Sequence, residues 1–264
     1  MSRATRLTAV AAVTLLALPA IAAARPAATH VKSPTGYDIS YPQCGAAYPT
    51  GVQFGIVGVN KGIVFSANPC LGGAGGELAW AERYEPAAVL YANTANPGPA
   101  LSSHWPSGQT TPRACDGSDS SGCAYDYGWN AAANSYADAV SAYVSLGKAP
   151  AGATQTPSPN EWWLDVETAN SWESNTAHNV AELQGEVAFL QSKGVASIGF
   201  YSSASDWQTI TGSSTAFAAF ASWRPGAGTR KSAQSYCGTR GVTGGPIKYS
   251  QYRASGFDAD IRCF

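Results

Sequence analysis

The sequence has 264 residues, of which 45% are hydrophobic and 12% charged, and its formal net charge is −1. This composition lacks the basic excess by which proteins bind nucleic acid, and it contains no polybasic segment that would hold a protein on an anionic membrane. We therefore expect neither nucleic acid nor a membrane surface as a partner.

Residues 1–24 have the pattern of a secretory signal peptide. Arg3 and Arg6 precede an apolar run that ends in three alanines, Ala22 to Ala24. The run is shorter than the ~20 apolar residues and flanking anchors of a transmembrane helix. We expect a secreted, extracellular protein without a membrane span in its mature form. Residues 25–35 would be a linker and residues 36–264 a single domain.

Strand-like and helix-like segments alternate along the domain. Short segments rich in aromatic and β-branched residues predict strands at 36–40, 54–60, 87–94, 161–167 and 195–203, with weaker candidates at 216–223 and 246–252. Apolar residues at helical spacing predict helices over 129–144 and 180–190, which Gly147 and Gly194 would end. No glycine-rich nucleotide fingerprint follows a strand, so the alternation favours a closed barrel over an open sheet. The predicted fold class is α/β, a (β/α)8 TIM-type barrel that is irregular in its last strands.

The six cysteines follow the predicted signal peptide, and an even number in an exported chain indicates disulfide bonds. Fifteen pairings are possible. Pairing neighbours along the chain suggests Cys44–Cys70, Cys115–Cys123 and Cys237–Cys263. One of these pairs falls in residues 94–127, a long Pro/Gly/Ser-rich loop after the third strand, where it favours order. Zinc is the competing interpretation, but no cysteine pair has ligand spacing and the histidines lie far apart, so we expect no metal.

Polar residues recur at the predicted strand ends. They are Asp38, Asn60, Asn93, Asp165, Glu167, Tyr201, Gln251 and Tyr252, and Asp258 and Asp260 follow the last strand. In a parallel barrel these ends open onto one face, where barrel enzymes have their active sites. Asp165 and Glu167 are two residues apart and should share one side of a strand. Two close carboxylates cannot both ionise easily, so we expect Asp165 to raise the pKa of Glu167 and make it a proton donor.

At these residues the sequence resembles the glycoside hydrolase family 25 lysozymes, which cut the sugar backbone of bacterial cell walls. Gly36, Asp38 and Ser40 match a Gly-x-Asp-x-Ser motif on the first strand, and Asp165 and Glu167 match Asp-x-Glu on the fourth. Gln251, Tyr252 and Asp260 match a Gln-Tyr pair followed by an aspartate. The resemblance covers most of residues 36–264. Stretches such as "YPQCG" and "CAYDYGWNAA" look closer still to secreted actinobacterial glycoside-hydrolase-like proteins.

The resemblance implies a barrel enzyme that hydrolyses an N-acetylated cell-wall glycan. Glu167 would be the general acid, Asp165 would position the 2-acetamido group or tune Glu167, and Asp38 and Asp260 would line the reacting subsite. The expected substrate-binding residues are Asn60, Tyr91, Asn93, Tyr201, Trp223, Gln251 and Tyr252. No cofactor is implied, the partner would be a cell-wall polysaccharide or another amino-sugar glycan, and the protein would be a monomer.

Some residues depart from the lysozyme pattern or have a structural interpretation. The third strand ends in "YANTANPG" where the lysozymes have Tyr-His-Phe-Ala, and Ser250 replaces a tryptophan. These changes leave open a glycan-binding protein without turnover, whereas a purely structural role would leave the acids unexplained. Trp172, Trp207 and Trp223 are candidates for stacking on sugar rings, while His104 and His178 are expected to be solvated.

Overall fold

The computed structural model describes residues 34–85, 87–148 and 157–264. The predicted signal peptide and residues 25–33 of the predicted linker lie outside this part of the chain. Within it, no helix is both long and apolar enough to cross a membrane.

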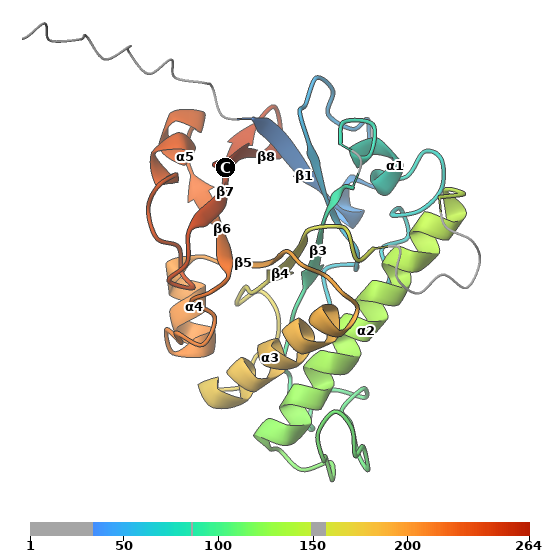
Figure 1. Cartoon of the computed structure of the whole chain (residues 1–264), viewed down its shortest axis with the longest axis vertical. Helices are drawn as coiled ribbons and strands as arrows, with labels where there is room; N and C mark the ends of the chain where they lie inside the picture. Colours follow the sequence, from blue (N-terminus) through green and yellow to red (C-terminus); the bar gives the residue numbers. More distant parts are fainter. Residues whose placement is uncertain (1–33, 86, 149–156) are drawn as a thin grey trace, which may run out of the picture. The chain divides into compact units, whose positions relative to one another are not determined.

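Eight strands form a closed barrel in sequence order. They are β1 (Thr35–Ile39), β2 (Gly55–Gly58), β3 (Val89–Asn93), β4 (Trp162–Asp165), β5 (Ile198–Tyr201), β6 (Ala221–Ala227), β7 (Ile247–Ala254) and β8 (Phe257–Arg262). Figure 1 shows them as a ring, with the helices outside it. Strands β1 to β7 pair in parallel, whereas β8 pairs antiparallel with both β7 and β1. The predicted barrel is confirmed, and its irregularity lies in the last strands, where β6 pairs with β7 through register shifts and β8 runs antiparallel.

A two-residue hairpin reverses the chain between β7 and β8. Ser255 and Gly256 both have positive φ, 55° and 82°. This is the backbone twist of a type I′ turn, which matches the twist of the flanking strands. As a result, β8 starts at the barrel end where the parallel strands finish.

Five α-helices and one short 3₁₀ segment connect the described strands. They are η1 (Tyr41–Gln43), α1 (Glu77–Ala81), α2 (Ser121–Ser145), α3 (Thr176–Ser192), α4 (Ala204–Thr211) and α5 (Arg230–Tyr236). Side chains of Ser120, Asn175, Ser203 and Thr229 accept hydrogen bonds from first-turn amides and so cap four of the helices. Gly147 and Gly194 lie just beyond α2 and α3 with positive φ, as the sequence predicts.

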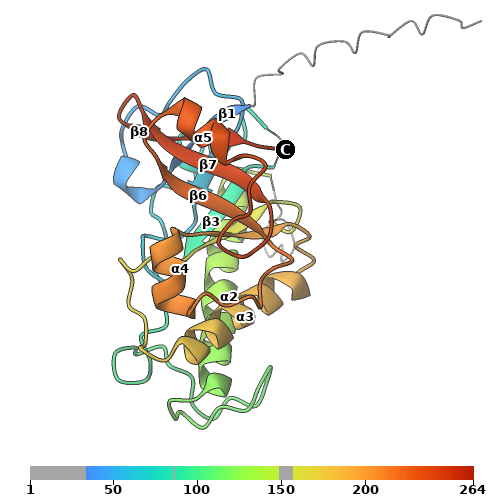
Figure 2. The ribbon, with the colours of Figure 1, turned by 90° about the vertical axis from the view of Figure 1, so that its left-hand side faces the viewer.

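Helices α2 and α3 pack against each other outside β3 to β5 (Figures 1 and 2). Their backbones touch at two glycines. An ideal Cβ at Gly128 would lie 2.0 Å from the Glu182 carbonyl oxygen, and one at Gly185 would lie 1.9 Å from that of Tyr125. The two helices therefore fix the positions of the loops that precede them.

Aromatic side chains fill the inside of the barrel. Phe54, Trp163, Trp223 and Tyr249 form a buried cluster there with Ile56 and Val89. Trp162, on the opposite face of β4, stacks on Tyr136 of α2. Both tryptophans of β4 are thus core residues, and the inner face of β4 continues from Trp163 to Asp165.

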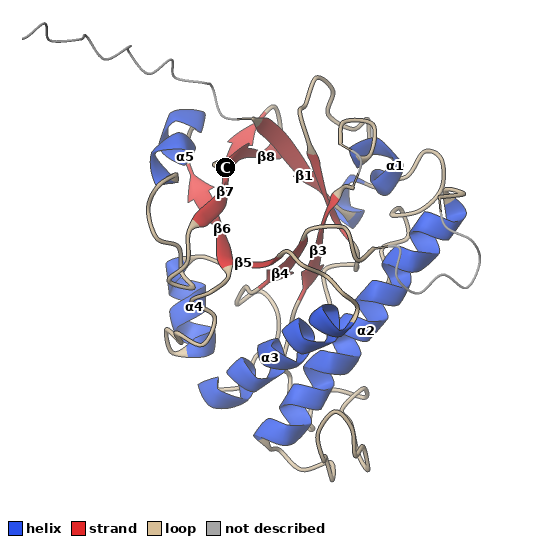
Figure 3. Cartoon of the chain, in the orientation of Figure 1, coloured by secondary structure: helices blue, strands red, loops and turns tan. Residues whose placement is uncertain are grey.

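The three predicted disulfide bonds, Cys44–Cys70, Cys115–Cys123 and Cys237–Cys263, are all present. The long loop after β3 ends earlier than predicted, because α2 already begins at Ser121 (Figure 3). Within this loop, Trp105 packs on Tyr127 and the Arg113 guanidinium lies over the Tyr125 ring. The loop is therefore anchored to α2 by side chains as well as by Cys115–Cys123.

Candidate active site

A cavity of about 290 Å³ lies at the carboxyl ends of the parallel strands. Its lining contains eight of the predicted site residues, Asp38, Tyr91, Asn93, Asp165, Glu167, Tyr201, Trp223 and Gln251, together with Ser40, Tyr41, Pro42, Gln43, Gly62 and Asp258. Three carboxyl groups of the expected catalytic set thus face the same space.

Asp165, the last residue of β4, is the more deeply buried member of the Asp-x-Glu pair. Only 5% of its surface is exposed, and Asn93 Nδ2 donates a hydrogen bond of 2.5 Å to its Oδ2. Asn60 holds Asn93 in turn, because its side chain bonds both the amide and the carbonyl of Asn93. Burial raises the pKa of Asp165 well above its ordinary value, and the charges of Glu167 and Asp38 raise it further. Burial and the neighbouring charges therefore both favour the protonated form of Asp165.

Glu167 is half-buried on the cavity wall, next to Asp165. Its pKa is raised first by burial and then by the charge of Asp206 at the start of α4. The hydrogen bond from Asp165 acts in the opposite direction and lowers the pKa of Glu167. The sequence predicts that Asp165 raises the pKa of Glu167, and this is wrong: Asp165 lowers it, and the like charge that raises it is that of Asp206.

Asp38 of β1 is connected to β7 and β5 by a chain of hydrogen bonds. Gln251 Nε2 donates to Asp38 Oδ2 at 3.0 Å, and the Tyr201 hydroxyl donates to Gln251 Oε1 at 3.0 Å. Burial and the charge of Asp258 raise the pKa of Asp38 to about 7. This carboxyl group changes its charge near neutral pH.

Asp260 does not line the cavity but lies behind it. It is fully buried, and Trp223 Nε1 donates a hydrogen bond of 2.7 Å to its Oδ1. Burial raises the pKa of Asp260 well above its ordinary value, and the nearby charge of Asp38 adds to the shift. Asp260 is therefore placed to support Asp38 and Trp223 from inside the barrel.

Tyr252 and Asn60 are also placed outside the cavity lining. Gln251 faces the barrel interior, so Tyr252, the next residue of the same strand, faces outward. There it packs with Ala233 of α5. Asn60 is fully buried and acts on the cavity only through Asn93.

The tryptophans predicted to stack on sugar rings lie in different environments. Trp207 is 2% exposed and packs between Phe200 and Phe217, so it presents no face for stacking. Trp172 is half-buried and donates a hydrogen bond of 2.9 Å from Nε1 to the Glu167 carbonyl oxygen. Its observed role is to hold the backbone at Glu167.

The residue pattern missed Asp206, which acts on Glu167 from α4. Asp206 accepts hydrogen bonds from Thr168 and Ser203, and its amide donates to Ser203 Oγ. The signal for this position was the Ser-x-x-Asp spacing of a helix N-terminus directly after the fifth predicted strand. Tyr41 and Gln43, also missed as cavity residues, belong to the 3₁₀ turn directly after β1.

Comparisons with known proteins find similarity to lysozyme-like proteins. A family model described as "Lysozyme-like protein 1" matches residues 151–227, which include Asp165, Glu167 and Trp223. A search of the curated proteins finds no match.

Among solved structures, a muramidase from Trichobolus zukalii is similar, with 18% identity and a TM-score of 0.51 over 87% of this chain and 93% of that one. The bacterial lysozyme from Streptomyces coelicolor has 17% identity and a TM-score of 0.51 over 88% and 93%. The modular autolysin LytC from Streptococcus pneumoniae, in complex with a synthetic peptidoglycan ligand, has 13% identity and a TM-score of 0.52 over 87% and 46%. The chain has the barrel fold of these lysozymes and muramidases, which confirms at the level of the fold its resemblance to the glycoside hydrolase family 25 lysozymes.

Proposed function

We propose that the protein is a secreted glycoside hydrolase that acts on an N-acetylated cell-wall glycan of the peptidoglycan type. The observation that carries this proposal is the convergence of Asp38, Asp165 and Glu167, all with raised pKa, in one cavity at the carboxyl end of the barrel. Glycoside hydrolysis generally uses a pair of carboxyl groups beside the scissile bond. The lysozyme, muramidase and peptidoglycan-bound autolysin with similar barrels support the substrate class.

Glu167 is the general acid in this proposal. It is the more exposed carboxyl group of the Asp-x-Glu pair, and burial raises its pKa toward the range that general acid catalysis needs. Asp165, held by Asn93, lies next to Glu167 and acts as a positioning residue, and burial favours its protonated form. Asp38 is on the β1 side of the cavity, where its ionised form, which dominates above its pKa of about 7, would stabilise the oxocarbenium-like transition state.

Export is part of the same proposal. Three disulfide bonds are typical of an oxidising compartment, and residues 1–24 have the pattern of a signal peptide.

Glycan binding without turnover is the second candidate. Small-ligand sites usually measure ~300–1,000 Å³. The cavity of about 290 Å³ is at the lower limit of that range. The second candidate rests mainly on the departures from the lysozyme pattern, Ser250 and the end of β3.

The deciding experiment measures reducing ends released from purified peptidoglycan by the secreted protein across the pH range. General acids typically contribute ~10²–10⁴-fold in rate, so Glu167→Gln should lose that factor while retaining glycan binding. Asp116→Asn is the matched control, because Asp116 is an exposed acid in the loop before α2. If the native protein binds glycan but releases no reducing ends at any pH, the second candidate is correct. If Glu167→Gln keeps full activity, the assignment of the acid is wrong.

A further inference from the structure

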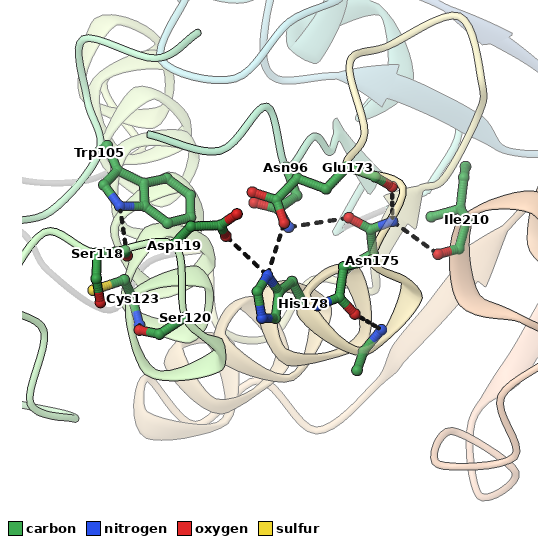
Figure 4. Close-up of polar contacts among 12 residues, drawn as sticks. Asn96, Trp105, Ser118, Asp119, Ser120, Cys123, Glu173, Asn175, His178 and Ile210 are labelled. Carbon is green, nitrogen blue, oxygen red and sulfur yellow. Dashed lines mark hydrogen bonds and ion pairs between the residues drawn. The ribbon is translucent and has the colours of Figure 1, made fainter. Parts of the chain in front are cut away.

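A second cluster of ionisable side chains lies away from the cavity, where the loop before α2 meets the loop before α3. Asp119, Glu173 and His178 each offer one ligand atom, and these atoms all lie within 4.8 Å of one another. His178 Nδ1 lies 2.8 Å from Glu173 Oε2 and 2.9 Å from Asp119 Oδ1 (Figure 4). The expectation that His178 is simply solvated is therefore wrong.

The geometry at His178 leaves its two acidic partners competing for one atom. Nδ1 carries at most one hydrogen, so it cannot donate a full hydrogen bond to both carboxylates. Glu173 is also largely buried, with 12% of its side chain exposed, which makes an unshared negative charge costly. A divalent cation between the three side chains would satisfy the imidazole nitrogen and both carboxylates at once.

The backbone around the cluster holds Glu173 and His178 in place. An ideal Cβ at Gly98 would lie 2.2 Å from Glu173 Oε1, so the carboxylate occupies space that only glycine leaves free. Asn179, the neighbour of His178, donates hydrogen bonds from Nδ2 to the carbonyl oxygens of Glu173 at 2.8 Å and Ile210 at 2.9 Å. Such outer contacts orient the ligands of metal sites.

A buried amide oxygen gives an independent sign of a missing ligand. Asn96 is fully buried, and its Nδ2 donates to Asn179 Oδ1 at 3.0 Å. Its own Oδ1 has no hydrogen-bond partner in the described part of the chain, although buried polar atoms are normally paired. The Asn96 amide also donates to the Ser171 carbonyl oxygen at 3.0 Å, so Asn96 lies beside the segment that carries Glu173. A water molecule bound to a cation there could donate to this oxygen.

We propose that Asp119, Glu173 and His178 Nδ1 bind one divalent metal ion of the zinc type, with water completing the coordination. An imidazole ligand favours zinc over calcium or magnesium, which prefer oxygen ligands. Tetrahedral Zn–N and Zn–O bonds of ~2.0–2.2 Å separate ligand atoms by about 3.3 Å, so the two contacts of His178 Nδ1 need to widen by only about half an ångström. Asp119 is exposed and is free to make most of this movement.

The proposed ion would connect the loop before α2 to the loop before α3. Asp119 ends the disulfide-bearing loop before α2, and Glu173 follows Trp172, which holds the Glu167 carbonyl. Metal binding would therefore stabilise the cavity rim. The proposal does not depend on the reaction, because binding and stability can be measured without substrate.

The test is a calorimetric titration of zinc chloride into chelator-treated, dialysed protein. We expect one zinc ion per chain with a Kd of about 10 µM or below, and a Tm that rises by about 5–10 °C at 100 times Kd. Glu173→Gln and His178→Gln should weaken binding at least tenfold. His104→Gln is the matched control, because His104 stacks on Phe65 outside the cluster, and it should bind zinc as the native protein does.

Two outcomes of the titration would overturn the proposal. One is the absence of saturable zinc binding up to about 100 µM, and the other is binding that Glu173→Gln and His178→Gln leave unchanged. If either variant fails to fold, anomalous diffraction from zinc-soaked crystals of the native protein decides the question. A zinc peak within bonding distance of His178 Nδ1 supports the site, and a peak elsewhere or none refutes it.

Discussion

The crossing of α2 and α3 allows a stringent test of the helix packing, with Gly185→Ala as the perturbation. The added Cβ would lie 1.9 Å from the Tyr125 carbonyl oxygen and 2.9 Å from the Trp129 amide nitrogen, whereas ordinary contacts begin at 3.4 Å. Both opposing atoms belong to the backbone of α2, so no side-chain rotation can make room. The helices would have to move apart by more than 1 Å, taking the cavity-side loops with them.

The expected change in the free energy of unfolding is the sum of two opposing effects. Overpacking of this kind usually costs ~1–3 kcal/mol, and the backbone contact places Gly185→Ala at the upper end. Replacing glycine with alanine within a helix stabilises the folded state by ~1 kcal/mol, because alanine has the higher helix propensity. The net loss of unfolding free energy is then about 2 kcal/mol, which lowers Tm by about 4–8 °C in a domain of this size.

The assay is urea unfolding with the disulfide bonds intact. Tryptophan fluorescence and far-ultraviolet circular dichroism monitor the transition. Coincident transitions would justify a two-state treatment. Gly75→Ala is the control, because its Cβ would meet no atom within 4 Å, and it should change stability by less than ~0.5 kcal/mol. A Gly185→Ala protein as stable as the native one would show that the two backbones do not touch.

Three further predictions concern charge and covalent structure. Asp206→Asn removes a negative neighbour that raises the pKa of Glu167, so the alkaline limb of the kcat/KM profile should move to lower pH; an unchanged limb would contradict this coupling. Burial raises the pKa of Glu186 from 4.5 to about 8, so the folded state retains a proton that the unfolded state loses. Stability should therefore fall as pH rises from 4.5 to 8, and Glu186→Gln should flatten that slope in denaturant titrations at several pH values. Replacing both cysteines of Cys237–Cys263 by alanine should cost about 3.5 kcal/mol, against about 2.5 kcal/mol for Cys115–Cys123, because the bridged residues are 26 and 8 positions apart. Equal losses in urea unfolding would contradict this dependence on loop length.

The parallel part of the barrel could be predicted because its strands carry strong local signals. The apolar segment before Asp165 predicts β4 within a few residues, and alternation along it places Asp165 and Glu167 on one side. β8 was missed, since Asp258 and Asp260 interrupt its apolar pattern. The Ser255-Gly256 pair between two strand-like segments was a hairpin signal that could have identified it.

The site was less predictable wherever contacts join distant parts of the chain. Strand alternation alone could have placed Tyr252 outside the barrel once Gln251 was assigned to the interior. No local pattern brings Asp119 to His178, which lies 59 positions later, because that contact depends on how α2 and α3 pack. For the same reason the influence of Asp206 on Glu167 appears only once the start of α4 is positioned beside the loop after β4, where Thr168 donates to Asp206.

The reversed direction of β8 determines how the barrel could be mounted on a surface. The Arg262 amide donates a hydrogen bond to the Pro34 carbonyl oxygen at 3.0 Å, so the first and last described residues of the barrel are neighbours. Phe264 lies with Val89 and Glu161, at the amino ends of β3 and β4. The cavity is at the opposite end of these strands. An affinity tag or solid support joined to Phe264 would therefore leave the cavity facing solution, where an insoluble polymer could reach it.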